Sequence, residues 1–291
     1  MTLKTFEQLK EKAQLNRFET SNSRIARLKK LQAWIKQHEA DIEQALFKDF
    51  KKPAFETQTT EIIMALSELK LFIKKTKCWM KDKKVSTPLS LLGHQSIIRY
   101  DNKGVVLIIS PWNYPFQLSV LPLIPALAAG NTVVIKPSEL TPHTSELVKK
   151  MCQDCFSENE VTVELGAKEK TEELLTFPFD HVFFTGSIPV GAIVAEKCAK
   201  KLIPYTLELG GKSPLIIDKN VDLQDAVEKT YWGKFLNRGQ ICVAPDTLFI
   251  HEKIKKDFIQ AYLAYAETLK NESPSQIITT KHEERDRKSV V

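Results

Sequence analysis

The sequence predicts an α/β protein, in which a doubly wound parallel sheet is followed by an incomplete second α/β domain. From residue 105 onward, short, uniformly apolar and β-branched runs alternate with helical stretches. Strands of this kind belong to parallel sheets that helices cover on both faces. The chain has 291 residues, of which 43% are hydrophobic, and this is enough for one large domain or two ordinary ones.

Residues 1–84 are predicted to be helical. Apolar residues recur at helical spacing within 25–35 and again within 62–73, and charged residues fill the other faces. Residues 85–103 contain short mixed runs framed by proline and glycine, which favour an exposed strand pair. We therefore interpret 1–84 as the N-terminal helices of the first domain and 85–103 as bridging, oligomerisation-type strands.

Five apolar runs within residues 104–210 are expected to be the strands of the sheet. They lie at 105–110, 132–136, 161–165, 181–185 and 205–209. Helices are predicted between them at 116–129, 142–156 and 190–201. Ligands of such sheets bind at the carboxyl ends of the strands, so the residues that follow each strand are the candidate site.

Residues 211–272 are predicted to form only part of a second domain. They contain a strand at 215–218, a helix at 223–235 and a further strand–helix pair within 248–269. A partial domain is expected to leave an apolar face uncovered. Residues 273–291 are polar and aperiodic, and we expect an atypical, disordered tail.

Charge and cysteine content narrow the function classes. Lys and Arg total 42 against 36 Asp and Glu, giving a net charge of +6, but the basic residues are scattered without interleaved aromatic residues. This pattern favours solvated helix faces over a nucleic-acid or anionic-membrane surface. No run approaches the ~18–20 apolar residues of an integral membrane segment, and no signal peptide is recognisable. The odd count of five cysteines predicts a cytoplasmic protein with free thiols, with Cys78 and Cys198 as packing residues.

Three polar residues at loops and strand ends are candidate catalytic groups. Cys242 lies in the loop Asn237-Arg-Gly-Gln-Ile-Cys-Val-Ala-Pro-Asp246, where a thiolate could act as a nucleophile. Asn113 follows the first strand between two prolines, and its amide is a neutral donor for a developing oxyanion. Glu208 ends the fifth strand, where a carboxylate serves either as a general base or as an ion-pair partner.

Other strand ends suit a nucleotide. Lys136 and Glu139 follow the second strand and supply a cation and a carboxylate for ribose hydroxyls. Gly186 and Ser187 open a turn that leads into a helix, where backbone N–H groups and the positive helix end attract a pyrophosphate.

Competing motifs are weaker. Gly211-Lys-Ser213 looks like the end of a P-loop, but Thr206 stands where that motif needs glycine, and no G-x-G-x-x-G occurs. Cys152 and Cys155 form a C-x-x-C without a second cysteine pair or a nearby histidine. Zinc is therefore disfavoured and a redox role stays an alternative. The six histidines have no ligand spacing, so no metal is expected.

Together these motifs resemble the aldehyde dehydrogenase superfamily. The segments Pro-Trp-Asn-Tyr-Pro-Phe and Gly-Gln-Ile-Cys-Val-Ala-Pro-Asp are similar to those of its class-3-like (fatty aldehyde) branch. The resemblance runs from about residue 5 to about residue 270. It implies an NAD(P)-binding parallel-sheet domain with a catalytic domain, NAD or NADP as the cofactor, an aldehyde substrate and, for the full-length family, a homodimer.

The resemblance also implies roles for single residues. Cys242 would attack the aldehyde and pass through a thiohemiacetal and a thioester, with Asn113 and the backbone N–H of Cys242 as oxyanion donors and Glu208 as the general base. The implied cofactor positions are Lys136 and Glu139 at the adenosine ribose, Gly186 and Ser187 at the pyrophosphate, and Trp112 and Leu209 along the cofactor.

Family members continue beyond the point where this chain ends. Residues 247–291 hold no motif close to Glu-Ile-Phe-Gly-Pro, through which the family holds the nicotinamide ribose. We therefore expect a C-terminally truncated chain whose last residues are a non-native tail. The alternative function is that of a catalytically inactive fragment that retains only nucleotide binding or an interaction role.

Overall fold

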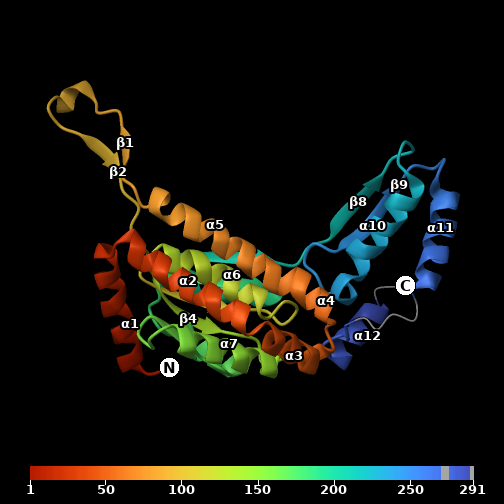
Figure 1. Ribbon diagram of the computed structural model, residues 1–291, viewed down its shortest axis with the longest axis horizontal. Coiled ribbons are helices and arrows are strands. Elements are labelled where there is room, and N and C mark those ends of the chain that lie inside the picture. The colour runs from red at the N-terminus through yellow and green to blue at the C-terminus, as the bar shows by residue number, and fades with distance from the viewer. Residues whose placement is uncertain (270–274, 289–291) are drawn as a thin grey trace.

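The computed structural model describes residues 1–269 and 275–288 (Figure 1). Its centre is a five-stranded parallel sheet with the strand order β5-β4-β3-β6-β7. The strands are β3 (Val105–Ile109), β4 (Thr132–Lys136), β5 (Val161–Val163), β6 (His181–Gly186) and β7 (Tyr205–Leu209). The chain builds outward from β3 in one direction and then in the other, so the predicted doubly wound sheet is confirmed.

Helices cover both faces of the sheet. Alternate residues of β3 point to opposite faces, so Val106 and Ile108 pack under one layer and Val105 and Leu107 under the other. The first layer comprises α2 (Ser21–Gln37), α3 (Glu39–Phe50), α5 (Ile63–Trp79), α6 (Gln117–Ala128) and α7 (Pro142–Cys155). The second comprises α1 (Leu3–Leu15), α8 (Lys168–Leu174) and α9 (Ile188–Ala199). Helix α8 was not predicted, because it is short and largely charged.

The turn from α6 into β4 depends on a glycine and a buried arginine. Gly130 has φ +88° just beyond the helix, a conformation that favours glycine. Arg24 lies against it and donates to the carbonyls of Ala129 at 2.7 Å and Asn16 at 2.9 Å. This contact joins α2, the end of α6 and the 3-10 turn η1 (Asn16–Phe18).

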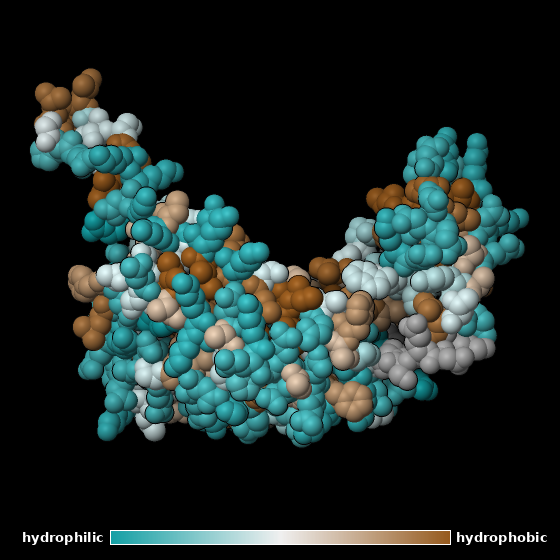
Figure 2. All heavy atoms as spheres, viewed as in Figure 1, coloured by the Kyte–Doolittle hydropathy of each residue, from teal (hydrophilic) through white to brown (hydrophobic). Residues whose placement is uncertain are grey.

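An arm, residues 83–98, projects from the end of α5 (Figure 1). Its strands β1 (Lys83–Val85) and β2 (Ser96–Ile98) pair antiparallel around the turn η3 (Leu89–Leu91). Leu89 and Leu92 are 90% and 84% exposed, and Figure 2 shows hydrophobic residues at the tip. The first strand begins inside the segment predicted to be helical, because three lysines near it resemble a continued helix surface.

The second unit contains a parallel pair, β8 (Ser213–Ile217) and β9 (Pro245–Ile250), with α10 (Leu223–Phe235) and α11 (Lys255–Thr268). Its buried core is small, comprising Ile217, Val227 and Phe258. Ile216 is 76% exposed and Phe249 56% exposed, and an open groove of about 310 Å³ runs between β9 and α11. Apolar surface is therefore uncovered here, as the sequence predicts.

The last described segment differs from the expected disordered tail. Ser275 is buried, the Gln276 N–H donates to the Phe50 carbonyl at 2.7 Å, and helix α12 spans Thr280–Lys288. Ile278 packs against the hydrophobic core of the first helix layer. Contacts with the rest of the chain order this segment. Those contacts could not be predicted, because a polar sequence has no hydrophobic periodicity. Residues 273–274 and 289–291 lie outside the described residues.

Within residues 1–269 and 275–288, none of the helices is both long enough and apolar enough to cross a lipid bilayer.

Candidate active site

Four strand ends meet at the carboxyl edge of the sheet. Ile109 at the end of β3 pairs with Lys136 and with Phe184, and Thr185 pairs with Glu208. The Asn113 loop, Lys136, the turn after β6 and Glu208 therefore project from the same edge. This edge, beside the point where the strand order reverses, is where open α/β sheets bind their ligands.

Two loops that are distant in the sequence are joined beside Cys242. The Asn113 side-chain amide donates to the Gln240 carbonyl at 2.8 Å, and the Asn237 amide donates to the Asn113 carbonyl at 2.9 Å. Gln240 precedes Cys242 by two residues. A Cβ atom on Gly211 would lie 3.1 Å from the carbonyl oxygen of Cys242, so the segment that follows Glu208 also passes close to the cysteine.

The turn before Cys242, η4 (Leu236–Gly239), has an unusual backbone. Asn237 and Arg238 have φ of 51° and 56°, and Gly239 has φ of 73°. Non-glycine residues in this region cost about 1–3 kcal/mol each and cluster at functional sites. Side-chain hydrogen bonds help to hold the turn: the Asn237 N–H donates to Glu56 at 3.2 Å, and the Gln240 side chain donates to the Asn237 carbonyl at 3.0 Å.

Cys242 itself is exposed, which leaves its sulfur accessible to a substrate. Tyr114, which directly follows Asn113, is buried. Burial raises the pKa of the Tyr114 hydroxyl, and the charges of Glu61, Glu56 and the Cys242 thiolate raise it further. Tyr114 therefore stays protonated and can donate a hydrogen bond. Glu208 is exposed near the end of β7.

The predicted cofactor residues suit a dinucleotide. Lys136 is buried at its strand end, and its Nζ lies 2.7 Å from the Glu139 carboxylate. A Cβ on Gly191 would lie 2.7 Å from Leu209 Cδ2, so the first turn of α9 packs directly on the end of β7. Among the described side chains none caps the N-terminus of α9 at Ser187, so its backbone N–H groups suit an anion.

The remaining predicted residues lie near this edge with different neighbours. Gly186 ends β6, and a Cβ there would meet the Phe184 ring. Trp112 packs edge-on against the His282 ring of α12, with 4.8 Å between the centroids. Leu209 is partly buried against the core of the second helix layer.

Several residues that build the site were not predicted. Glu56 and Gln240 bind the turn and the segment after residue 274: Ser275 donates to Glu56 at 3.1 Å, and Gln240 receives the Ile278 N–H at 3.0 Å. Lys52 and Glu61 lie buried under the Asn113 loop. Charged residues within helical stretches resemble solvated faces, whereas Tyr114 and Gln240 stood inside recognised motifs but were assigned no role there.

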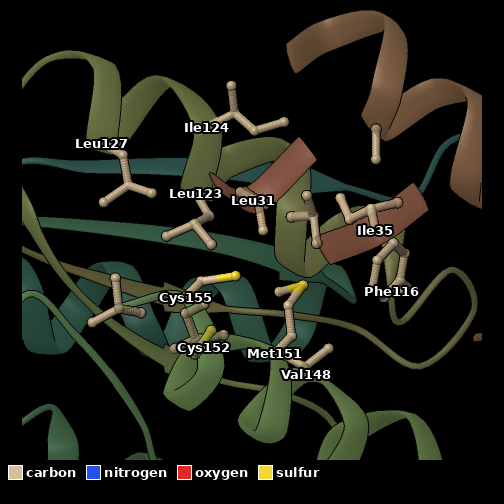
Figure 3. Close-up of a cluster of buried hydrophobic side chains, with 14 of the residues drawn as sticks. Leu31, Ile35, Phe116, Leu123, Ile124, Leu127, Val148, Met151, Cys152 and Cys155 are labelled. Atoms are coloured by element: carbon tan, nitrogen blue, oxygen red, sulfur yellow. The ribbon is translucent and has the colours of Figure 1, made fainter. Parts of the chain in front are cut away.

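The other cysteines are separate from the site. Cys152 and Cys155 point from α7 into the core beside Met151 (Figure 3), and burial raises the pKa of Cys155 to about 11. Cys198 is buried, as predicted for a packing residue, but Cys78 is exposed, so that prediction was wrong. Cys78 lies on α5 outside the face that packs on the core, because a helical period assigns a face only approximately.

Comparison with known proteins identifies a family and a branch. The aldehyde dehydrogenase family model matches residues 7–290, beyond the expected limit near residue 270. The chain is 48% identical over 238 residues to 4,4'-diaponeurosporen-aldehyde dehydrogenase of Staphylococcus aureus, covering 82% of this chain and 52% of that protein. It is 39% identical over 257 residues to mouse aldehyde dehydrogenase family 3 member B2, covering 88% and 54%. The class-3-like resemblance is therefore confirmed.

Solved structures share the fold. The substrate-bound state of Staphylococcus aureus AldH superposes with a TM-score of 0.92 at 41% identity, covering 98% of this chain and 64% of that chain. An NADP-dependent enzyme of E. coli gives 0.87 at 26% identity, covering 95% and 59%. PnpE in complex with nicotinamide adenine dinucleotide gives 0.88 at 25% identity, covering 97% and 59%. The chain spans about half the length of the curated relatives it matches.

Proposed function

The chain belongs to the aldehyde dehydrogenase family, and from that premise we propose that it oxidises an aldehyde to a carboxylic acid with NAD or NADP. The observation that carries this proposal is the bond from the Asn113 amide to the Gln240 carbonyl at 2.8 Å. It holds an oxyanion donor against the loop of an exposed cysteine, the arrangement that nucleophilic attack on a carbonyl requires.

In the proposed mechanism, the Cys242 thiolate attacks the aldehyde carbon and forms a C–S bond. The Asn113 amide has two N–H groups. One is used by Gln240, and the other stabilises the oxyanion together with the backbone N–H of Cys242. With a nicotinamide cofactor held at the sheet edge by Lys136, Glu139 and the turn at Gly186 and Ser187, this carbon would have an acceptor for its hydride. Glu208 then takes a proton from water, the water oxygen attacks the resulting thioester, and the C–S bond breaks to return the thiolate.

We assign the cofactor to the carboxyl edge of the sheet. Lys136 and Glu139 would hold the adenosine ribose, and the turn at Gly186 and Ser187 would receive the pyrophosphate at the N-terminus of α9. Trp112 and Leu209 would line the rest of the cofactor. The buried Lys136 ammonium and the uncapped helix end of the described structure support this assignment.

The test follows NAD(P)H formation by absorbance with a medium-chain aldehyde and each cofactor in turn. Turnover that the Cys242→Ala variant lacks is the expected result. Because Cys242 is exposed, its replacement by alanine should affect folding little, so a loss of turnover in this variant would report on the thiol itself.

A second candidate function is that of a catalytically inactive protein that retains nucleotide binding. The exposed Ile216 and Phe249 favour it, because a second unit with uncovered apolar residues holds its loops less firmly. Absence of turnover together with an increase in melting temperature on addition of NAD would select this candidate. Absence of both effects would contradict the two candidates alike.

We further propose that the arm, residues 83–98, pairs with a second copy of the chain to form a homodimer. Its short strands have open edges, and Leu89 and Leu92 expose apolar surface that pairing would bury. Light scattering after gel filtration should give twice the chain mass for the wild type and the single mass for Leu89→Asp/Leu92→Asp. A monomeric wild type would refute the pairing.

We also propose a cytoplasmic location, because all five cysteines are free thiols in this structure. Fractionation of cells that express the protein checks this, and recovery with secreted proteins would contradict it.

A further inference from the structure

A buried ion pair lies directly under the loop that carries Asn113. Lys52 Nζ is 2.6 Å from Glu61 Oε1, and both side chains are fully buried. Lys52 follows the end of α3. Glu61 lies in the π-helical turn η2 (Gln58–Ile62), which joins α4 (Ala54–Thr57) to α5. π-Helical turns are rare and frequently occur at functional sites.

Glu61 holds the C-terminal end of the Asn113 loop. Its second oxygen, Oε2, accepts the backbone N–H groups of Phe116 at 3.1 Å and Gln117 at 2.8 Å. These groups begin α6, which has no cap from the side chain of Phe116 itself. A carboxylate at this position is favoured by the positive end of the helix as well as by the two donors.

Lys52 holds the middle of the same loop. Its Nζ lies 4.0 Å from the centroid of the Tyr114 ring, a cation–π distance, in a space from which water is excluded. Tyr114 directly follows Asn113, so its ring position limits the directions in which the Asn113 side chain can point. The pair therefore contacts the loop at the residue after Asn113 and again at its end.

Filling this space with an ion pair has a free-energy cost. Burying two charges removes their hydration, and apolar residues of equal volume are often no less stable than a buried ion pair. Desolvation lowers the pKa of Lys52, and the Glu61 carboxylate opposes that effect. A geometric role explains the pair better than packing does, because its groups contact atoms of one loop.

We propose that Lys52 and Glu61 are positioning residues, which orient the Asn113 amide toward the carbonyl that reacts at Cys242. The inference rests on the proposed function and adds two residues to its machinery. Neither residue touches the substrate in this proposal. Both act through the Asn113–Tyr114 segment, which also has hydrogen bonds with Gln240, Asn237 and the Leu118 N–H.

Two reactions of the Cys242 thiolate separate positioning from general damage. With p-nitrophenyl acetate, the thiolate attacks the acetyl carbonyl through an oxyanion, p-nitrophenolate leaves, and an acetyl thioester remains. With iodoacetamide, the sulfur forms a bond to the methylene carbon, iodide leaves, and no oxyanion arises. Neither reaction needs a cofactor, and only the first needs the Asn113 donor.

The principal variant is Lys52→Met/Glu61→Gln, which replaces the ion pair by neutral groups of similar volume and leaves an amide oxygen for α6. We expect its acylation burst to slow by about tenfold to a hundredfold, because a displacement near 1 Å has an effect of that size. Alkylation of Cys242 should stay within about twofold. The matched control is Arg27→Met, which breaks a partly buried ion pair with Glu160 that is remote from the loop. It should leave both rates unchanged.

A double-mutant cycle with Asn113→Ala tests the coupling itself. Asn113→Ala alone should slow acylation by about 10²–10³, and adding the Lys52/Glu61 substitutions should slow it little further, because the group that they position is gone. If the principal variant does not fold, Lys52→Arg serves instead. It keeps the charge opposite Glu61 while changing the contact with Tyr114, and we expect a several-fold loss of acylation.

Three results would overturn the inference while leaving the proposed function intact. They are unchanged acylation in the folded variant, an equal loss in both reactions, and full additivity with Asn113→Ala. A wild type that shows no Cys242-dependent burst would instead overturn the proposed function, and the inference with it.

Discussion

Gly130→Ala should destabilise the protein strongly through the contact with Arg24. The new Cβ would lie 2.6 Å from the Arg24 Nη2 atom and 2.7 Å from its Cζ atom, closer than such atoms approach one another. Arg24 is almost fully buried and cannot withdraw without losing its bonds to the carbonyls of Ala129 and Asn16. The substitution therefore strains the backbone and displaces a charged donor from the core.

The size of the effect follows from these two parts. An alanine with φ near +88° costs about 1–3 kcal/mol in backbone strain, and loss of a hydrogen bond to a charged group costs about 1.5–3 kcal/mol. We therefore expect the free energy of unfolding to fall by about 2.5–6 kcal/mol. The measurement is the urea unfolding curve, followed by circular dichroism.

Gly233→Ala is the matched control. Gly233 lies within α10, and its nearest foreign atom would be 3.7 Å from the new Cβ, an ordinary contact. Alanine is favoured over glycine in a helix by about 0.5–1 kcal/mol, so this variant should be more stable than the wild type. Equal changes in both variants, or a Gly130→Ala protein as stable as the wild type, would refute the role given to Arg24.

Three further predictions concern the thiols, a helix cap and a histidine. Burial raises the pKa of the Cys155 thiol to about 11, which leaves about one part in a thousand ionised near pH 8. Peptide mass spectrometry should therefore find native, buried Cys155 alkylated by iodoacetamide more slowly than the exposed Cys78, by about a hundredfold or more. Similar rates would favour a redox role for the C-x-x-C. Asp49 accepts the N–H groups of His143 and Thr144, so Asp49→Ala should lower the free energy of unfolding by about 1–2 kcal/mol in urea, and no change would contradict its role as the cap of α7. Burial, and then the charge of Lys103, lower the pKa of His181. The unfolded chain therefore binds the proton more readily, and stability falls as the pH drops below about 6.5 toward the lower folded pKa. Thermal melts across this range should show a weaker pH dependence for His181→Gln.

Local patterns were enough for the central sheet and for the candidate catalytic groups. The five predicted apolar runs correspond to the five strands of the sheet, because strands buried on both faces have continuous apolar sequences. Asn113 and Cys242 stood in distinctive motifs whose order along the chain followed the strand ends. Helices α8 and α12 were not predicted, because short polar helices have no apolar face to detect.

Only the tertiary structure could decide what surrounds Cys242. The sequence indicated an asparagine after one strand, a glutamate at the end of another and a cysteine in a loop ahead of a third, because strand propensity and turn chemistry act between neighbours in the chain. It did not determine that Gln240 receives the Asn113 amide, or that Lys52 and Glu61 are buried under Tyr114. The Asn113–Gln240 contact joins residues 127 positions apart, and Glu61 contacts Phe116 across 55 positions. Their energies depend on burial and orientation, which exist only once the layers have packed.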